Sequence, residues 1–169
     1  ADSLAIKDMA GLLRPFDAYE LVKNLKSTLS IPIHMQTHAT TGMSTATNMK
    51  AIEAGIDNID TSISSLSMTY GHTATETMLA IFENQERVIN LDLSALEEVS
   101  IFFKEIRDKY SEFEGNLKGV DSSMLVKQVP GGMLSNLESQ LRANKQEDKI
   151  DLVKDEIPRV RKDFGYPPL

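Results

Sequence analysis

The stretch IPIHMQTHATTGMSTATNMKAIEAG, residues 31–55, has the pattern of a short strand followed by a helix. Apolar and polar side chains alternate along residues 33–38, which predicts a strand with one buried face and one polar face. The following segment repeats uncharged side chains at helical spacing, which predicts the inner face of a helix. The positions on that predicted inner face are Thr45, Met49, Ile52 and Ile56.

Two similar strand–helix units flank this stretch. One has a strand at residues 4–6 and a helix that begins at Pro15, a residue that suits the first helical turn. The other has a strand over residues 58–63 and a helix over residues 75–82. Regular alternation of strand and helix predicts parallel strands with right-handed crossovers, in either an α/β barrel or a doubly wound sheet.

The second half of the chain changes to an all-helical pattern. Ser94 and Glu97 form a capping box that would start a long helix, and two further helices are expected after it. A closed barrel of eight units needs roughly 200 residues, so residues 1–85 are expected to form about three βα units. Residues 86–169 are expected to form a helical extension. The long helix is predicted to bury one face made of Leu96, Val99, Phe103, Ile106, Tyr110 and Phe113.

The composition is that of a soluble globular domain, with 41% hydrophobic and 25% charged residues. The net charge of −7 contains no basic block, so nucleic acid and an anionic membrane surface are not expected as partners. The absence of cysteine excludes disulfides and thiolate metal ligands. There is no membrane-length apolar run and no signal peptide, so we expect no membrane insertion and a cytoplasmic location. The sequence starts without methionine, inside a strand, and we expect it to be a piece of a longer protein.

The polar face of the strand at residues 33–38 carries the first candidate site. His34, Gln36 and His38 share this face. In parallel α/β proteins the chemistry gathers at the carboxyl ends of strands, which favours Gln36 and His38 over His34. A His-x-His pair would place two imidazoles on one metal ion, but Gln36 occupies the first of these positions. The alternative is a hydrogen-bonded pair that only lines the interior of a barrel.

Two other residues and one segment could also have a functional role. Lys7 ends the first strand, where a lysine can form a Schiff base, contact phosphate or be carbamylated by carbon dioxide, or be only a charged strand terminus. His72 lies in a loop and is predicted to be structural or to face solvent. The segment QVPGG, residues 128–132, is predicted to be a sharp turn that starts a helix.

Four segments taken together point to a family. They are IKDMAGLL at 6–13, HATTGMSTATNMKAIEAG at 38–55, SSLSMTYGHTATET at 64–77 and QVPGGMLSNLESQLRANKQEDK at 128–149. They resemble the carboxyltransferase domain of biotin-dependent enzymes, over essentially the whole chain. The resemblance is closest to the alpha subunit of oxaloacetate decarboxylase and the carboxyltransferase subunit of transcarboxylase, and more distant to pyruvate carboxylase.

The resemblance implies a fold and a metal site. The implied fold is the later part of a TIM-type (β/α)8 barrel, followed by a helical extension that forms a funnel over its mouth. In the family, the lysine of the KDMAG motif is carbamylated and binds a divalent metal with two histidines spaced His-x-His and an aspartate. Lys7 matches that lysine, His38 matches the second histidine, and Gln36 stands where the first would be. Because an amide oxygen binds zinc less well than an imidazole does, we expect weaker metal binding.

The resemblance also implies an activity and partners. The activity is transfer of a carboxyl group between biotin and a keto acid such as oxaloacetate or pyruvate, with a zinc, cobalt or manganese ion. The sequence has no AMKM-type biotinylation motif, so another domain or chain must supply the biotin. The full-length protein is expected to form an oligomer. The resemblance leaves open a transcarboxylase, a subunit of a two-chain pyruvate carboxylase, and part of a sodium-pumping decarboxylase held at the membrane by its partners. Other family site residues belong to segments outside this sequence, so the 169-residue piece is expected to be inactive alone.

Two other functions stay open. Metal-dependent aldol lyases and synthases also carry His-x-His late in a barrel, but they generally lack the KDMAG and PGGMLSN motifs. A non-catalytic scaffold, either a decayed paralogue or a piece without a site, is favoured by Gln36. Flanking segments resembling RDxxQS upstream and VTPSSQ downstream would favour the enzyme.

Overall fold

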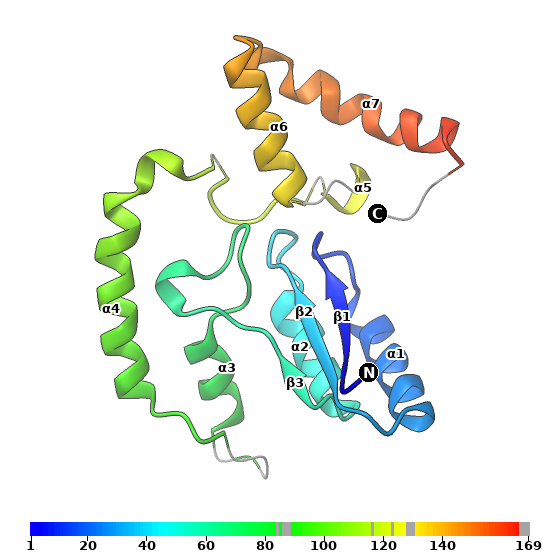
Figure 1. The fold of residues 1–169 in the computed structure, drawn as a ribbon, viewed down its shortest axis with the longest axis vertical. Coiled ribbons are helices and arrows are strands. Elements are labelled where there is room, and N and C mark those ends of the chain that lie inside the picture. The colour runs from blue at the N-terminus through cyan, green and yellow to red at the C-terminus, as the bar shows by residue number, and fades with distance from the viewer. Residues whose placement is uncertain (84, 86–88, 116, 123, 128–130, 166–169) are drawn as a thin grey trace.

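The computed structural model describes residues 1–83, 85, 89–115, 117–122, 124–127 and 131–165. Strands and helices alternate in the first half around a three-stranded parallel sheet of order β1-β2-β3 (Figure 1). The predicted α/β fold is confirmed. The elements are β1 (Leu4–Asp8), α1 (Pro15–Thr28), β2 (Ile33–Thr37), α2 (Ser44–Glu53), β3 (Asn58–Ile59), the short 3-10 helix η1 (Ser64–Leu66) and α3 (Thr75–Phe82).

The described part of the second half is helical, as expected. The predicted boundary at residue 85 stays a prediction, because residues 84 and 86–88 lie outside the described residues, as do residues 128–130 of the predicted turn. No helix among the described residues is long and apolar enough to cross a membrane. The helical elements are α4 (Leu93–Lys109), η2 (Ser111–Phe113), α5 (Met124–Lys127), α6 (Gly131–Ala143), η3 (Glu147–Lys149) and α7 (Ile150–Asp163).

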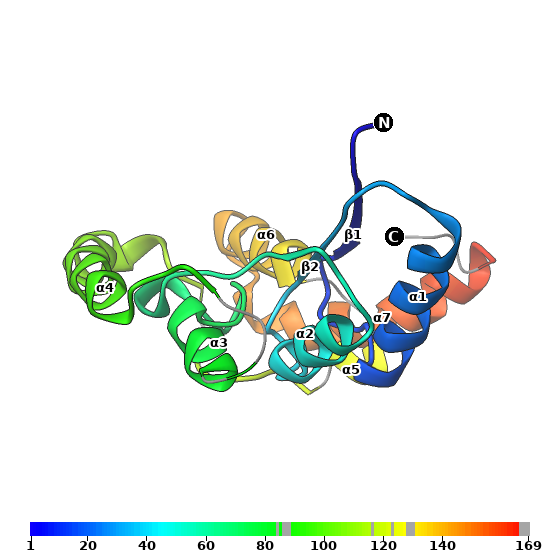
Figure 2. The same cartoon turned by 90° about the horizontal axis from the view of Figure 1, so that it is seen from below.

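The core lies between the sheet and the two helices α1 and α2, which cover the same side of it (Figure 2). Pro15 starts α1 after an extended Arg14, as its fixed φ angle favours. Burial alternates along β2 as predicted, since Ile33 and Met35 are buried while His34 and Gln36 are half-buried. The buried members of this core are Ala18, Val22, Ile33, Met35, Ala51 and Ile56.

The predicted inner face of α2 is confirmed only in part, because Ile56, just beyond the helix, is buried and Ile52 packs against the core, whereas Thr45 and Met49 are half-buried. Small and polar side chains are buried instead, and their hydroxyls bind neighbouring segments. Ser44 Oγ lies 2.7 Å from Thr73 Oγ1, and Thr47 Oγ1 donates to the carbonyl oxygen of Leu13 at 2.9 Å. Small residues allow α2 to pack closely, while larger ones such as Ile52 remain half-buried. The buried residues of α2 are Ser44, Thr47, Asn48 and Ala51.

The third strand is much shorter than the predicted range of residues 58–63. Only Asn58 and Ile59 pair with β2. Further on, the Ser62 N–H donates to the carbonyl oxygen of Thr73 at 3.0 Å. After β3 the chain leaves the sheet, and Ser62 pairs with the residues that precede α3.

Two predictions about α4 are wrong. The helix is capped by Asp92, whose side chain accepts the Ala95 N–H at 3.0 Å, and not by Ser94. The predicted aromatic face is not buried, because Tyr110 and Phe113 are 51% and 77% exposed. Among the six predicted residues only Leu96, Phe103 and Ile106 are half-buried.

The last helices cover the carboxyl ends of β1 and β2. Figure 1 shows α5, α6 and α7 above these strand ends. Ala10, in the loop after β1, is buried with Met124 of α5, and half-buried Leu12 and Ile157 pack against them. The Asp121 N–H, just before α5, donates to the carbonyl oxygen of Thr40 at 2.7 Å and so joins the loop after β2 to the helical part. The helical part therefore closes over the end of the sheet where chemistry is expected.

Candidate metal site

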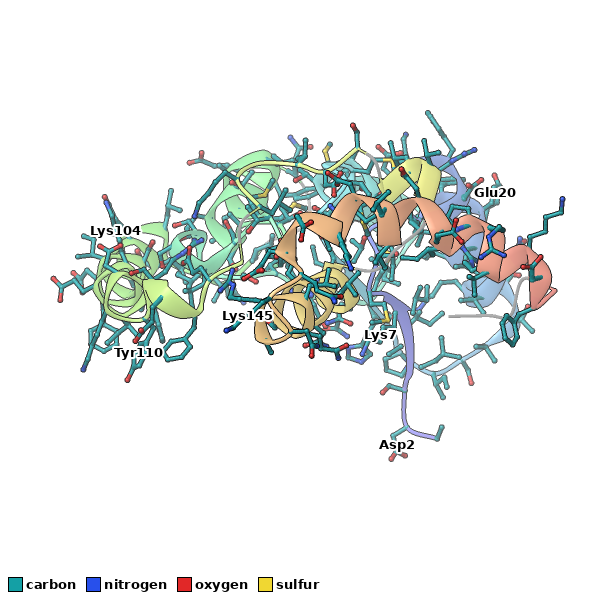
Figure 3. The ribbon with its side chains drawn as sticks, turned by 90° about the horizontal axis from the view of Figure 1, so that it is seen from above. Asp2, Lys7, Glu20, Lys104, Tyr110 and Lys145 are labelled. Atoms are coloured by element: carbon teal, nitrogen blue, oxygen red, sulfur yellow. The ribbon has the colours of Figure 1, made fainter. Side chains whose placement is uncertain are left out.

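Two predicted site residues lie side by side on the sheet. Lys7 of β1 is the register partner of Gln36 of β2, and partners in parallel strands point to the same face. This face is turned away from α1 and α2, because the opposite face of β2 forms the core. Lys7 is exposed. Figure 3 looks down on the strand ends and shows Lys7 near the middle of the molecule, far from Lys104 on α4.

The ring of His38 is oriented by a polar contact at one of its nitrogens. Its Nδ1 lies 2.7 Å from the carbonyl oxygen of Tyr70. A carbonyl oxygen only accepts, so Nδ1 carries a proton, and in the neutral ring Nε2 is the nitrogen with the lone pair. Metal-binding histidines are commonly oriented by such a contact to their other nitrogen. His38 is therefore prepared to act as a neutral nitrogen ligand.

Asp8, next to Lys7, has a structural role that the sequence reasoning did not find. Its carboxylate accepts the N–H groups of Leu12 and Leu13, each at 2.9 Å. It also accepts the hydroxyl of Thr37 at 2.8 Å. Asp8 therefore organises the loop after β1 and joins it to β2, and all three of these contacts are structural.

Gly11 allows the loops after β1 and β2 to meet backbone to backbone. Its φ angle is +67°, and a Cβ atom there would lie 2.5 Å from the carbonyl oxygen of His38. The Thr41 hydroxyl donates to the Gly11 carbonyl oxygen at 2.5 Å, and the His38 N–H donates to the backbone carbonyl oxygen of Asp8 at 3.0 Å. The glycine of the KDMAG motif therefore brings the end of β1 against His38.

His72 is not solvent-facing, although one of the two sequence interpretations placed it there. Its ring centroid lies 4.6 Å from that of His38, with the planes tilted by 39°. Its Nε2 is buried and has no hydrogen-bond partner among the described residues, and its Nδ1 lies 3.4 Å from Ser62 Oγ. Burial lowers the pKa of His72, a positive charge on the neighbouring His38 would lower it further, and Asp60 opposes both effects. His72 is thus a second imidazole against the candidate ligand.

The ligands predicted from the sequence at this face are a mixed set of nitrogen and oxygen donors. No group of three His, Cys, Asp or Glu side chains suited to a metal occurs in the described part of the chain. The available donors are instead the Nε2 atom of His38, the amide oxygen of Gln36 and, once carbamylated, Lys7. His34 lies two residues further from the strand end than Gln36, paired with Ala5 and Asn58.

Two family descriptions match this chain. Residues 1–102 match the HMGL-like family, and residues 124–169 match the conserved carboxylase domain. The methylmalonyl-CoA carboxyltransferase 5S subunit of Propionibacterium freudenreichii subsp. shermanii is 49% identical over 171 residues, which cover 100% of this chain and 34% of that protein. A pyruvate carboxylase subunit of Methanocaldococcus jannaschii is 47% identical over 169 residues, which cover 99% of this chain and 30% of that protein. The chain thus spans about a third of the length of these relatives.

Solved structures show the same arrangement of elements. The carboxyl transferase domain of Rhizobium etli pyruvate carboxylase, solved with pyruvate and biocytin, matches with a TM-score of 0.93 and 33% identity. The match covers 98% of this chain and 28% of that one. The same domain solved with 3-hydroxypyruvate matches equally well, with a TM-score of 0.93. The likeness therefore includes both the α/β part and the helical part.

Proposed function

Because this chain belongs to the HMGL-like family and matches the conserved carboxylase domain, we propose that the intact protein transfers a carboxyl group between biotin and a keto acid. The family resemblance drawn from the four motifs is confirmed. The keto acid is of the oxaloacetate or pyruvate type, and biotin arrives on another domain or subunit. The observation that supports the proposal best is that Lys7 lies beside Gln36 while the contact of His38 Nδ1 with the Tyr70 carbonyl oxygen leaves Nε2 as the nitrogen for a ligand.

The proposed ligands of the ion are Lys7, Gln36 and His38. A divalent ion of the zinc, cobalt or manganese kind would supply positive charge where the keto-acid oxygen becomes negative as the carboxyl group leaves. Carbamylated Lys7 contributes an anionic oxygen, and Gln36 a neutral one. His38 contributes a nitrogen whose direction is set by the Tyr70 carbonyl group. His72 limits the movement of the His38 ring by packing on it.

The proposed activity is tested with the intact protein and its biotin carrier. Biotin-dependent decarboxylation of oxaloacetate, followed through pyruvate formation, is the expected result. The 169-residue piece is expected to give less than about a hundredth of that rate, since single groups that stabilise developing charge are worth about 100-fold or more and the family places several outside this piece. The absence of a biotin-dependent reaction by the intact protein would contradict the proposal, and a full rate from the piece would contradict the expectation that the piece is inactive alone.

Replacing Gln36 by histidine is expected to strengthen divalent metal binding in the intact protein. The change restores the His-x-His spacing and substitutes an imidazole for an amide oxygen, so zinc affinity should rise by about tenfold or more. Calorimetric titration of metal-free protein with zinc measures this. His34→Gln, on the same face but further from the strand end, serves as the control and should change the affinity little. Equal zinc affinity with Gln36 and with histidine would remove position 36 from the ligand set.

A non-catalytic scaffold is the second candidate function, and Gln36 is the observation that favours it. A protein that no longer carries out the reaction has no need of an imidazole at this position. This candidate predicts that the intact protein shows neither biotin-dependent decarboxylation nor zinc binding that depends on Lys7 or His38. The same two measurements therefore distinguish the candidates.

A further inference from the structure

The loop at residues 64–72 holds the His38 ring. The Tyr70 carbonyl oxygen accepts from His38 Nδ1 at 2.7 Å, and the Gly71 carbonyl oxygen accepts the Ala39 N–H at 2.9 Å. Both contacts come from two consecutive peptide groups of this loop. A shift of the loop would therefore remove the group that sets the direction and the tautomer of His38.

This loop adopts a conformation that needs support from outside it. Met68 and Thr69 have φ angles of 61° and 48°, in the left-handed region that side chains with a Cβ atom disfavour. Such residues are strained and persist only where the surroundings hold them. Gly71 is also enclosed, because a Cβ atom there would lie 2.9 Å from the Leu66 carbonyl oxygen. Hydrogen bonds within the loop, such as Gly71 N–H to the Met68 carbonyl oxygen at 2.7 Å, close the turn without anchoring it.

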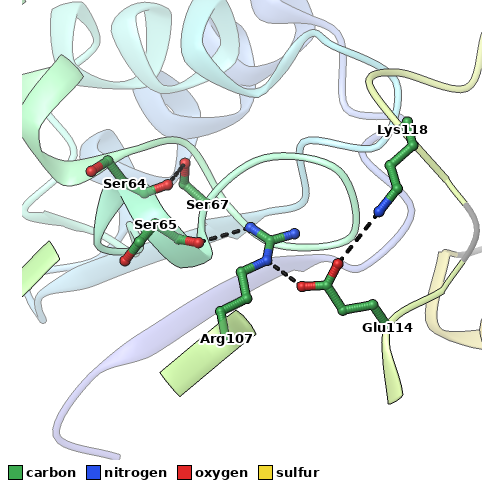
Figure 4. Close-up of polar contacts among 6 residues, drawn as sticks. All are labelled: Ser64, Ser65, Ser67, Arg107, Glu114 and Lys118. Atoms are coloured by element: carbon green, nitrogen blue, oxygen red, sulfur yellow. Dashed lines mark hydrogen bonds and ion pairs between the residues drawn. The ribbon is translucent and has the colours of Figure 1, made fainter. Parts of the chain in front are cut away.

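The helical part supplies an anchor through Arg107 of α4 (Figure 4). Arg107 Nη1 donates to the Ser65 carbonyl oxygen at 2.7 Å. Its Nε donates to the carboxylate of Glu114, which lies just after η2. Lys118 approaches the other oxygen of Glu114 at 3.5 Å. The planar guanidinium thus joins α4, the segment after η2 and the loop with two donors that point in fixed directions.

A second contact of the same segment reaches Tyr70 itself. Gly115 follows Glu114 directly, and a Cβ atom at Gly115 would lie 2.5 Å from Tyr70 Cε2. The backbone after η2 therefore packs against the ring of the residue whose carbonyl oxygen holds His38. Arg107 fixes this backbone through Glu114 as well as fixing the loop through Ser65.

We propose that Arg107 is a positioning residue for His38, acting through the loop at residues 64–72 and not by contact with substrate or metal. The proposal rests on the function proposed above in one respect only, namely that His38 is a metal ligand. In this role Arg107 keeps the Tyr70 carbonyl oxygen within hydrogen-bond distance of His38 Nδ1. The charge of Lys118 at the edge of the cluster is not needed for this.

The test uses the intact protein with Arg107→Ala and Arg107→Lys. The first readout is the tautomer of His38 in metal-free protein, from ¹⁵N histidine spectra assigned with a His38→Gln sample. Wild type should show the Nδ1-protonated form, and Arg107→Ala a mixture of both forms. The second readout is zinc affinity, expected to fall by about tenfold, as for other groups that orient a metal ligand. Arg107→Lys keeps one charged donor and should lose less.

Matched controls separate this role from general effects on folding. Arg159→Ala removes an exposed arginine that pairs with Glu156 and Asp163 on α7, and should change neither readout. If Arg107→Ala does not fold, Arg107→Lys carries the test with the same two readouts. The tautomer is read without metal or carboxyl transfer, so its result is independent of the rate assay that tests the proposed function. An unchanged tautomer and zinc affinity in the Arg107 variants would overturn the proposal.

Discussion

Replacing Lys7 by arginine in the intact protein is expected to lower the rate of biotin-dependent decarboxylation by about 100-fold to 1000-fold. The guanidinium stays protonated and cannot form the carbamate. It would also place a fixed positive charge beside Gln36, where the ion is proposed to bind. The measurement is the steady-state rate of pyruvate formation from oxaloacetate at saturating biotin carrier.

The matched control for this experiment is Lys23→Arg. Lys23 is an exposed lysine of α1 that lies 5.7 Å from the Tyr19 ring centroid, on the helical side of the sheet. An arginine there keeps the charge and the ring contact, so the rate should stay at the wild-type value. A rate for Lys7→Arg as high as that of Lys23→Arg would show that the reaction does not need a carbamate at Lys7.

Replacing Gly11 by alanine is expected to lower the free energy of unfolding by about 2–4 kcal/mol. The new Cβ atom would lie 2.5 Å from the His38 carbonyl oxygen, which is backbone and cannot turn aside. The φ angle of +67° adds strain for any residue with a Cβ atom. The loops after β1 and β2 would have to separate. Urea unfolding followed by circular dichroism measures the loss.

Gly55→Ala is the control that isolates the effect of backbone angle. Gly55 has a φ angle of +97°, but a Cβ atom there would meet nothing within 4 Å. We therefore expect a loss of about 1–2 kcal/mol from strain alone. Equal losses of unfolding free energy at Gly11 and Gly55 would mean that the close approach of Gly11 to His38 does not contribute to stability.

The α/β part was largely predictable because its elements follow simple local rules. Pro15 starts α1, and α3 occupies the predicted residues 75–82. Alternation along β2 correctly assigned Ile33 and Met35 to the core. These features depend on the chain's own periodicity, which burial against the adjacent helices reinforces.

The predicted buried faces of α2 and α4 were wrong where the segments packed against a helix, and not its own sequence pattern, determine which side chains are buried. On α2 the buried face consists of small and polar residues such as Thr47, whose hydroxyl binds the Leu13 carbonyl oxygen. A hydrophobic pattern cannot reveal this, because the energy comes from close approach and hydrogen bonds. Likewise the aromatic spacing on α4 predicted a core, yet Phe113 is 77% exposed.

The sequence selected the residues of the candidate site, whose role as ligands stays a prediction, but it did not predict their geometry. Strand alternation placed Gln36 on the polar face, and the KDMAG motif selected Lys7. The register that pairs them, and the contact of His38 with Tyr70, come from segments far apart in the chain. His72 was missed as a neighbour of His38 because a single histidine in a loop carries no periodic signal.

The most direct test of the proposed metal site is calorimetric titration of the intact, metal-free protein with zinc in bicarbonate buffer. Wild type is compared with Lys7→Ala and with His38→Ala. The predicted result is one binding site per chain in wild type, with affinity lowered at least about tenfold in each variant. Zinc binding of the same stoichiometry and affinity in all three proteins would contradict a metal site formed by Lys7 and His38.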